Sequence, residues 1–126
     1  TVSIVIAQRL VRKICPHCID ERKISEIDKQ KLKDFLSKLE INKIKKLYFG
    51  SGCDKCAGTG FKGRIGIFEV MQINNQIKDA IVRMSPAREI KNIAIKNGMQ
   101  TMLENGFSKA FKGLTSIEEI LRIIHE

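Results

Sequence analysis

The sequence has no tryptophan, one tyrosine and two prolines among its 126 residues. Its six phenylalanines are spread through helical patterns, so no platform of basic and aromatic side chains is present for stacking nucleic-acid bases. No hydrophobic run approaches the roughly 20 residues that a membrane-spanning helix requires. These absences argue against a protein that binds single-stranded nucleic acid and against an integral membrane protein.

The first residues, TVSIVIAQRLVR, lack an initiator methionine, a basic leading segment and the small-residue cleavage site of a secretory signal peptide. We therefore expect no signal peptide, and we interpret the chain as an internal part of a longer protein. Its length suits one domain, or two small lobes, with an apolar core of ordinary size.

Positive charge dominates, because 23 lysines and arginines oppose 14 acidic residues and leave a net charge of +9. Such a charge favours acidic partners. The lysines are scattered, however, through segments such as KQKLKDFLSKLEINKIKK, where they fit the solvated faces of helices. We therefore expect no nucleic-acid partner from charge alone.

The spacing of hydrophobic residues predicts an α+β fold that is mostly helical. Strands are predicted at residues 9–14, 46–49 and 65–71, one helix at 25–40, and further helices near 75–84, 86–97, 99–111 and 117–124 that form a C-terminal bundle. Gly106 interrupts the hydrophobic stripe of one of these helices, which predicts a close approach by a neighbouring helix. At the start of the last helix two pairs have the spacing of a capping box, Thr115 with Glu118 and Ser116 with Glu119.

All four cysteines lie in two Cys-x-x-Cys pairs, Cys15 with Cys18 and Cys53 with Cys56. Each pair brings two sulfurs to one turn, and two such turns complete a tetrahedral shell around Zn²⁺. Four sulfur ligands leave no open position, so the predicted zinc is structural and performs no reaction. We expect N–H groups near Gly58 and Gly60 to donate to the sulfurs, because glycine lets the backbone turn toward them.

Two other uses of the cysteines remain as alternatives. Disulfides within the pairs would close small strained loops, and the chain shows no secretory signature. The motif CPHC also occurs at the active site of oxidising thiol oxidoreductases, but that reading leaves Cys53 and Cys56 unused. His17 lies inside this motif, and we interpret it as an exposed spacer and not as a ligand.

The glycine-rich segment GTGFKG at residues 58–63 matches the dinucleotide pattern GxGxxG. It follows a cysteine turn and precedes a predicted strand, whereas a dinucleotide loop follows a strand and opens a helix. Arg64 and Ile65 stand where a Walker A motif has Lys and Ser or Thr. His17 and His125 have no evident nucleophile nearby, so we predict that this stretch alone is no enzyme and holds no catalytic residue.

Three segments in order, AQRLVRKICPHC, GCDKCAGTGFKGRIGIFEV and GMQTMLENGFSKAFKGLTSIEEILR, closely resemble the C-terminal part of the bacterial type II secretion and type IV pilus assembly ATPases. The resemblance covers nearly the whole chain and is weakest across residues 19–48. It implies a hexameric P-loop ATPase at the cytoplasmic face of the inner membrane. ATP and Mg²⁺ would bind only upstream, at Walker motifs that are absent here.

The resemblance also implies a division of this sequence and a set of partners. The implied segments are residues 1–14 as the end of a RecA-like core, 15–63 as a tetracysteine zinc subdomain with a helical insertion, 64–71 as the last core strand, and 72–126 as a helical subdomain. Partners would be the other subunits of the hexamer and an inner-membrane platform protein. Arg9 and Arg64 would approach nucleotide or a neighbouring subunit.

The leading hypothesis is thus a structural zinc module of a secretion or pilus motor. Two alternatives stay open at this point. One is a freestanding zinc-ribbon protein that binds nucleic acid through its basic surface, which predicts salt-dependent affinity. The other is the thiol-disulfide oxidoreductase, which predicts a reactive Cys15 and no bound metal.

Overall fold

The computed structural model describes residues 4–124, so the predictions for residues 1–3 and for His125 and Glu126 lie outside the described residues. In chain order the elements are β1 (Ile4–Ile14), β2 (Ile19–Lys23), α1 (Glu26–Leu32), α2 (Lys38–Lys43), β3 (Lys46–Gly50), the 3₁₀ turn η1 (Asp54–Cys56), β4 (Phe61–Gln72), α3 (Asn75–Val82), α4 (Ala87–Lys96), α5 (Met102–Phe111) and α6 (Ile117–Ile124). The predicted α+β class is confirmed, with six α-helices and two small antiparallel sheets in the described part.

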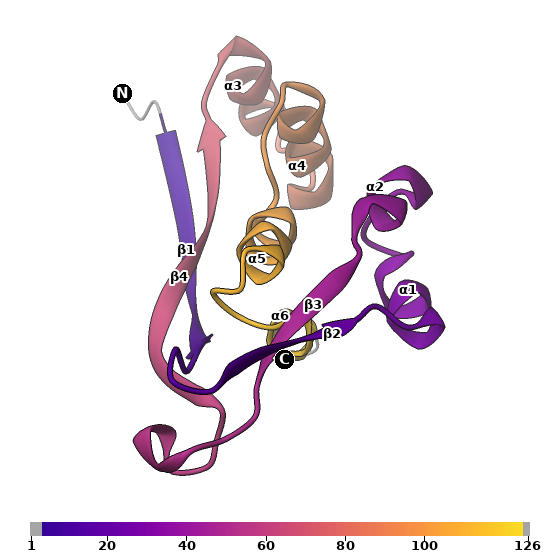
Figure 1. Cartoon of the computed structure of the whole chain (residues 1–126). Helices are drawn as coiled ribbons and strands as arrows, with labels where there is room; N and C mark the ends of the chain where they lie inside the picture. The colour runs from indigo at the N-terminus through magenta and orange to yellow at the C-terminus, as the bar shows by residue number, and fades with distance from the viewer. Residues whose placement is uncertain (1–3, 125–126) are drawn as a thin grey trace.

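The longer sheet pairs β1 with β4 in an antiparallel ribbon that runs along one side of the molecule (Figure 1). Both strands were predicted, but each extends several residues further than the hydrophobic pattern indicated. Val11 and Ile67 lie on the face that packs against the helices and are buried. On the opposite face Ile6 pairs with Val70, and both side chains remain exposed.

The segment between the cysteine pairs differs from the prediction. Residues 25–40 form two short helices, α1 and α2, and not one, because Ser25 and Ser37 each begin a helix with its own capping box. The polar segment IDERK forms β2, which pairs with β3 from Ile19 opposite Gly50 to Lys23 opposite Lys46. A segment with one hydrophobic residue has no alternating pattern, so its strand conformation is recognised only from its pairing with β3.

The C-terminal helices contact both sheets. Helix α5 packs against β4 and β3, and α6 packs against α5 and β1 (Figure 1). A Cβ atom on Gly106 would lie 2.9 Å from Cδ1 of Ile120, so the predicted close approach at Gly106 is confirmed. The absence of a side chain here lets α6 cross α5 closely.

One hydrophobic core joins parts of the chain that are far apart in sequence. Its buried members are Val11, Leu32, Ile41, Leu47, Ile67, Phe107, Ala110, Ile117, Ile120 and Ile123. The rings of Phe35 and Phe107 lie 5.9 Å apart, so the insertion between the cysteine pairs rests directly on α5. Within the described residues, no helix combines the length and the hydrophobicity needed to cross a membrane.

Candidate metal centre

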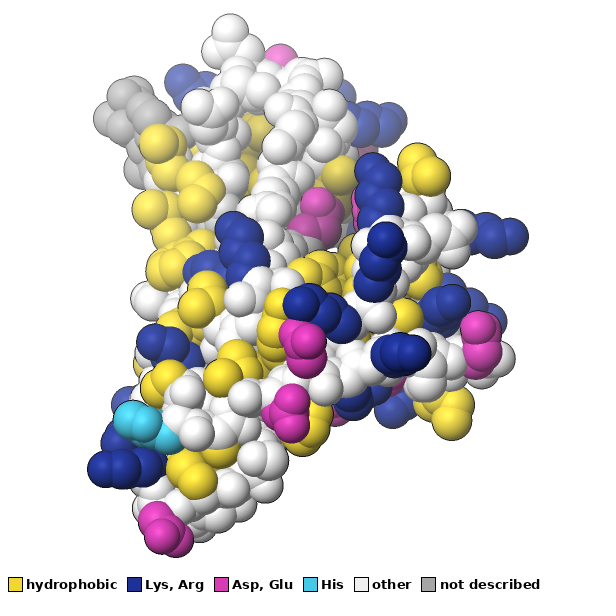
Figure 2. All heavy atoms as spheres, in the orientation of Figure 1, with side chains coloured by type: hydrophobic (Ala, Val, Ile, Leu, Met, Phe, Trp, Pro, Cys, Tyr) yellow, Lys and Arg dark blue, Asp and Glu magenta, His cyan; other side chains and the backbone are white. Residues whose placement is uncertain are grey.

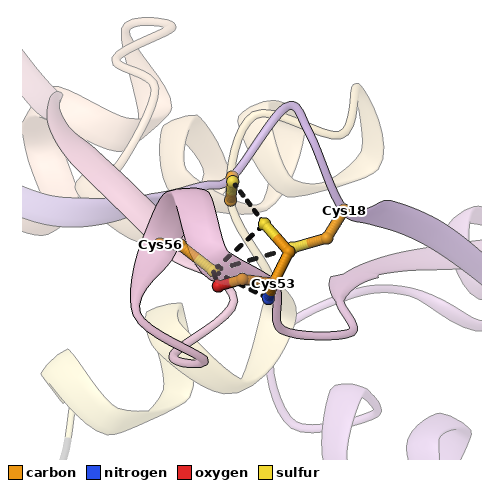
Figure 3. Close-up of side chains that lie close together, drawn as sticks. Cys18, Cys53 and Cys56 are labelled. Carbon is orange, nitrogen blue, oxygen red and sulfur yellow. Dashed lines mark hydrogen bonds between the residues drawn. The ribbon is translucent and has the colours of Figure 1, made fainter.

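The four cysteines converge at one end of the β1–β4 ribbon. Figure 3 labels three of them, Cys18, Cys53 and Cys56, and shows their side chains close together. Cys15 directly follows β1, Cys18 precedes β2, Cys53 precedes η1, and Cys56 ends it. All four Sγ atoms lie within 4.8 Å of one another, and the pairs Cys15–Cys53, Cys18–Cys56 and Cys53–Cys56 are separated by 3.8, 3.8 and 3.7 Å. These four residues can therefore hold one metal ion.

The spacing of the sulfurs fits zinc. A tetrahedron with zinc–sulfur bonds of about 2.3 Å places its sulfur atoms about 3.8 Å apart. A disulfide requires about 2.05 Å between its sulfurs, and all four cysteines are free thiols in the structure. The oxidoreductase alternative uses only one of the two pairs and gains no support from an arrangement in which both converge.

Backbone N–H groups point at the buried sulfur of Cys56. The N–H of Cys53 donates to it at 3.3 Å and that of Gly60 at 3.2 Å, which confirms the expected donor at Gly60. The N–H of Gly58 donates instead to the carbonyl of Cys53 at 2.9 Å. Burial raises the pKa of Cys56, but these two N–H groups and its cysteine neighbours outweigh it and lower the pKa to about 6.

The pKa of Cys18 is shifted in the opposite direction to that of Cys56. Burial raises its pKa to about 11, and hydrogen bonds with the other three cysteines act in the same direction. Four thiols packed this closely do not all ionise without a compensating cation, since each new thiolate repels the next. A divalent ion among them would supply that compensation, so the donor set fits a metal held by four thiolates.

The backbone of the second cysteine turn contacts both the first turn and the end of β3, and the contact with β3 requires glycine. The N–H of Cys15 donates to the carbonyl of Gly60 at 2.9 Å. Gly60 has a φ of +80°, a conformation that favours glycine, and a Cβ on Gly50 would lie 2.0 Å from the Gly60 carbonyl oxygen. The end of β3 and the second cysteine turn therefore approach backbone to backbone.

Replacing Gly50 by alanine is expected to destabilise the protein by about 1–3 kcal/mol, because the new methyl group would displace the Gly60 carbonyl. Thermal unfolding and competition for metal by a chelator would both report the loss. A suitable control is Gly58→Asn, since Gly58 has a φ of +76° that asparagine tolerates and no atom within 4 Å of a Cβ. Equal stability of the two variants would contradict the assigned contact.

The first cysteine turn is also anchored to the link between α5 and α6. The N–H of Ile14 donates to the carbonyl of Leu114 at 3.0 Å, and the hydroxyl of Thr115 donates to the carbonyl of Arg12 at 2.7 Å. The C-terminal helices therefore hold the end of β1 from which the turn starts.

A buried carboxylate next to this anchor was not predicted. Ser116 accepts from the N–H of Glu119 at 3.1 Å, as the capping pattern indicated. The Glu119 carboxylate, however, accepts from the N–H and the guanidinium of Arg12 and from the guanidinium of Arg122 at 2.8–3.2 Å. Burial raises the pKa of Glu119, but the two arginines outweigh it and lower the pKa to about 2. No sequence spacing links Arg12 to a partner 107 positions away.

The other residues singled out in the sequence lie outside the cysteine cluster. His17 is exposed and is not part of the metal-binding group, as expected for a spacer. The guanidinium of Arg9 donates to the carbonyl of Ile123 at 3.2 Å, near the end of α6. Arg64 is exposed on β4 opposite Arg12. Contacts of Arg9 and Arg64 with nucleotide or another subunit stay predictions.

The structure is therefore that of an α+β protein with a four-cysteine cluster that can hold a metal ion, in which Cys15 and Cys56 are buried and Cys18 and Cys53 are half-buried. Residues 1–122 match the family model of the type II/IV secretion system proteins, and the chain belongs to that family. The family resemblance seen in the sequence is thereby confirmed.

Relatives in this family carry names of both systems. The chain is 44% identical to the type IV pilus assembly ATPase PilB of Thermus thermophilus, over 93% of this chain and 13% of the relative. It is 40% identical to the type IV pilus assembly ATPase TfpB of Acinetobacter baylyi, over 95% of this chain and 20% of the relative. It is 34% identical to the type II secretion system protein E of Aeromonas hydrophila, over 97% of this chain and 23% of the relative. The chain thus spans less than a quarter of the length of these relatives.

Proposed function

We propose that this chain is the C-terminal part of a motor ATPase that drives type II secretion or type IV pilus assembly, and that its four cysteines hold a structural Zn²⁺. The observation that carries the proposal is the convergence of four Sγ atoms from two turns that are far apart in sequence, with three pairs of these atoms 3.7–3.8 Å apart. Zinc bound there supplies structural cohesion and no reaction, because four thiolates complete its shell.

The chain's own residues give this module its mechanical role. Cys15 and Cys18 stand between β1 and β2, and Cys53 and Cys56 stand between β3 and β4, so one ion joins the entry and the exit of the insertion. The insertion in turn packs on α5 through the common core. A mechanical force on β1 or β4 would therefore be transmitted to α5 and α6 through the packed insertion, which the ion keeps folded.

The rest of the longer protein would supply the chemistry. We propose that ATP and Mg²⁺ bind in the part outside this sequence, that the whole protein assembles as a hexamer, and that it meets a platform protein at the cytoplasmic face of the inner membrane. The exposed apolar face of the β1–β4 ribbon, made by Ile4, Ile6, Leu10, Phe68 and Val70, supports attachment to a larger core. Hydrophobic side chains gather on that side of the molecule (Figure 2).

Metal analysis of the purified protein tests the proposal. We expect one zinc per chain, and we expect a chelator to remove the zinc together with part of the helical circular dichroism signal, because metal binding and folding are coupled. A protein that is fully folded and free of metal after purification without chelators would refute the structural zinc.

A further inference from the structure

A groove of about 660 Å³ lies between the insertion and α5, away from the cysteines. Its apolar lining comes from Leu36 and Ile44 beside α2, Tyr48 of β3, and Phe107 and Phe111 of α5. Phe107 belongs to the buried core, so the groove opens directly onto it. An apolar depression of this kind on a surface is typical of a binding site.

The charges at the edge of the groove are unbalanced. Lys43, Lys45 and Lys112 line it, and none of the three forms an ion pair within the described residues. Lys46 is the exception, since its ammonium lies 2.8 Å from the carboxylate of Glu21. In Figure 2, lysine and arginine side chains lie beside hydrophobic ones in the middle of the molecule, with some acidic side chains between them.

The two acidic residues at the edge are engaged in local helix caps. The Glu40 carboxylate accepts from the N–H of Ser37 at 3.4 Å as part of a capping box. The Glu104 carboxylate accepts from the hydroxyl of Thr101 at 3.1 Å at the start of α5. Neither carboxylate pairs with Lys43, Lys45 or Lys112, so these three lysines are available to acidic groups of another molecule.

We propose that this groove binds an acidic amphipathic segment of a partner protein, with its apolar side chains on the phenylalanine floor and its carboxylates at Lys43, Lys45 and Lys112. Apolar burial supplies most of the binding free energy in such grooves, and the charges set orientation and specificity. A nucleic acid fits less well, because the half-buried aliphatic side chains of Leu36 and Ile44 make up part of the lining and offer bases no ring on which to stack. The inference deepens the proposed role in partner contacts, and it does not depend on zinc.

The experiment uses the purified full-length protein that contains this chain and a fluorescent synthetic peptide of Leu, Ala and Glu, with Leu at helical spacing. A second peptide carries Lys in place of Glu, and a third carries Ser in place of Leu. We expect binding of the first peptide alone, with an affinity that falls as salt rises. A single-stranded oligonucleotide serves as the competing ligand.

Two variants locate the binding site. The double variant Lys43→Glu with Lys112→Glu is expected to weaken peptide binding about tenfold, because it replaces two attractions at the rim by two repulsions. Ser108→Trp, which fills the groove from α5, is expected to abolish binding. The matched control Lys31→Glu with Lys78→Glu changes the net charge equally on exposed positions of α1 and α3, and should bind as the wild type does.

The proposal is overturned if the control weakens binding as much as the groove variants, if the peptide without Leu binds equally well, or if the oligonucleotide binds the groove more tightly than the peptide does. Metal content and helical signal are measured on the same samples. If the wild-type protein contains no zinc but binds the first peptide, the proposed metal role alone is refuted. If it contains zinc but does not bind the first peptide, the groove proposal alone is refuted.

Discussion

Replacing Cys56 by serine is expected to abolish stable zinc binding and to unfold the insertion between the two cysteine turns. Zinc in a structural four-ligand site contributes about 10–16 kcal/mol of apparent binding free energy, whereas a whole domain is stable by only about 5–15 kcal/mol. A serine hydroxyl does not ionise near neutral pH and binds zinc poorly. Metal content and hydrogen exchange of the amides at residues 15–63 would measure the two losses.

The matched control for this variant is His17→Ala. His17 lies inside the first cysteine turn, but its side chain is exposed and outside the sulfur cluster. We expect this variant to keep one zinc per chain and wild-type exchange rates. If Cys56→Ser instead retained a full zinc complement and unchanged protection, the cysteine cluster would not be the metal site.

The Glu119→Gln substitution is expected to lower the free energy of unfolding by about 3 kcal/mol, because it breaks a buried ion pair. The side chain of Glu119 is fully buried, while those of Arg12 and Arg122 are half exposed and regain hydration when the carboxylate is lost. This partial recovery keeps the expected cost at the low end for buried pairs. Chemical denaturation at neutral pH would measure the difference.

Glu118→Gln provides the control on the neighbouring position. Glu118 contacts Arg22 at 2.6 Å, but its side chain is 54% exposed, and such surface pairs contribute only about 0–1 kcal/mol. A cost for Glu118→Gln equal to that of Glu119→Gln would contradict the structural assignment, since burial is the main difference between the two carboxylates.

The same carboxylate predicts how stability changes with pH. The folded state lowers the pKa of Glu119 from 4.5 to about 2, so the ionised group stabilises the fold fully above about pH 4.5. This contribution is lost as the pH falls from about 4.5 toward 2, because folding then requires a proton to leave the carboxyl. The stability difference between wild type and Glu119→Gln should therefore shrink across that range, and a constant difference would argue against the pair.

Several features of the fold were predictable because they depend on residues close in sequence. The two long strands, the capping of α6 by Ser116 and the helix crossing at Gly106 all follow from local patterns of hydrophobicity, capping and glycine. The single helix predicted at residues 25–40 was wrong, because Ser37 begins a second helix and the intervening residues turn toward the core. Strand β2 was missed because its polar sequence is held by pairing with β3.

What the sequence by itself determined is the set of cysteines able to share one ion. Each Cys-x-x-Cys turn brings its own two sulfurs together through a few covalent bonds, so the ligands can be named without knowing the fold. Only the tertiary structure decided that the two turns meet, that Glu119 is buried between Arg12 and Arg122, and that a lysine-edged groove opens beside α5. Those features arise from packing between distant segments, and packing is a property of the whole folded chain that no local spacing encodes.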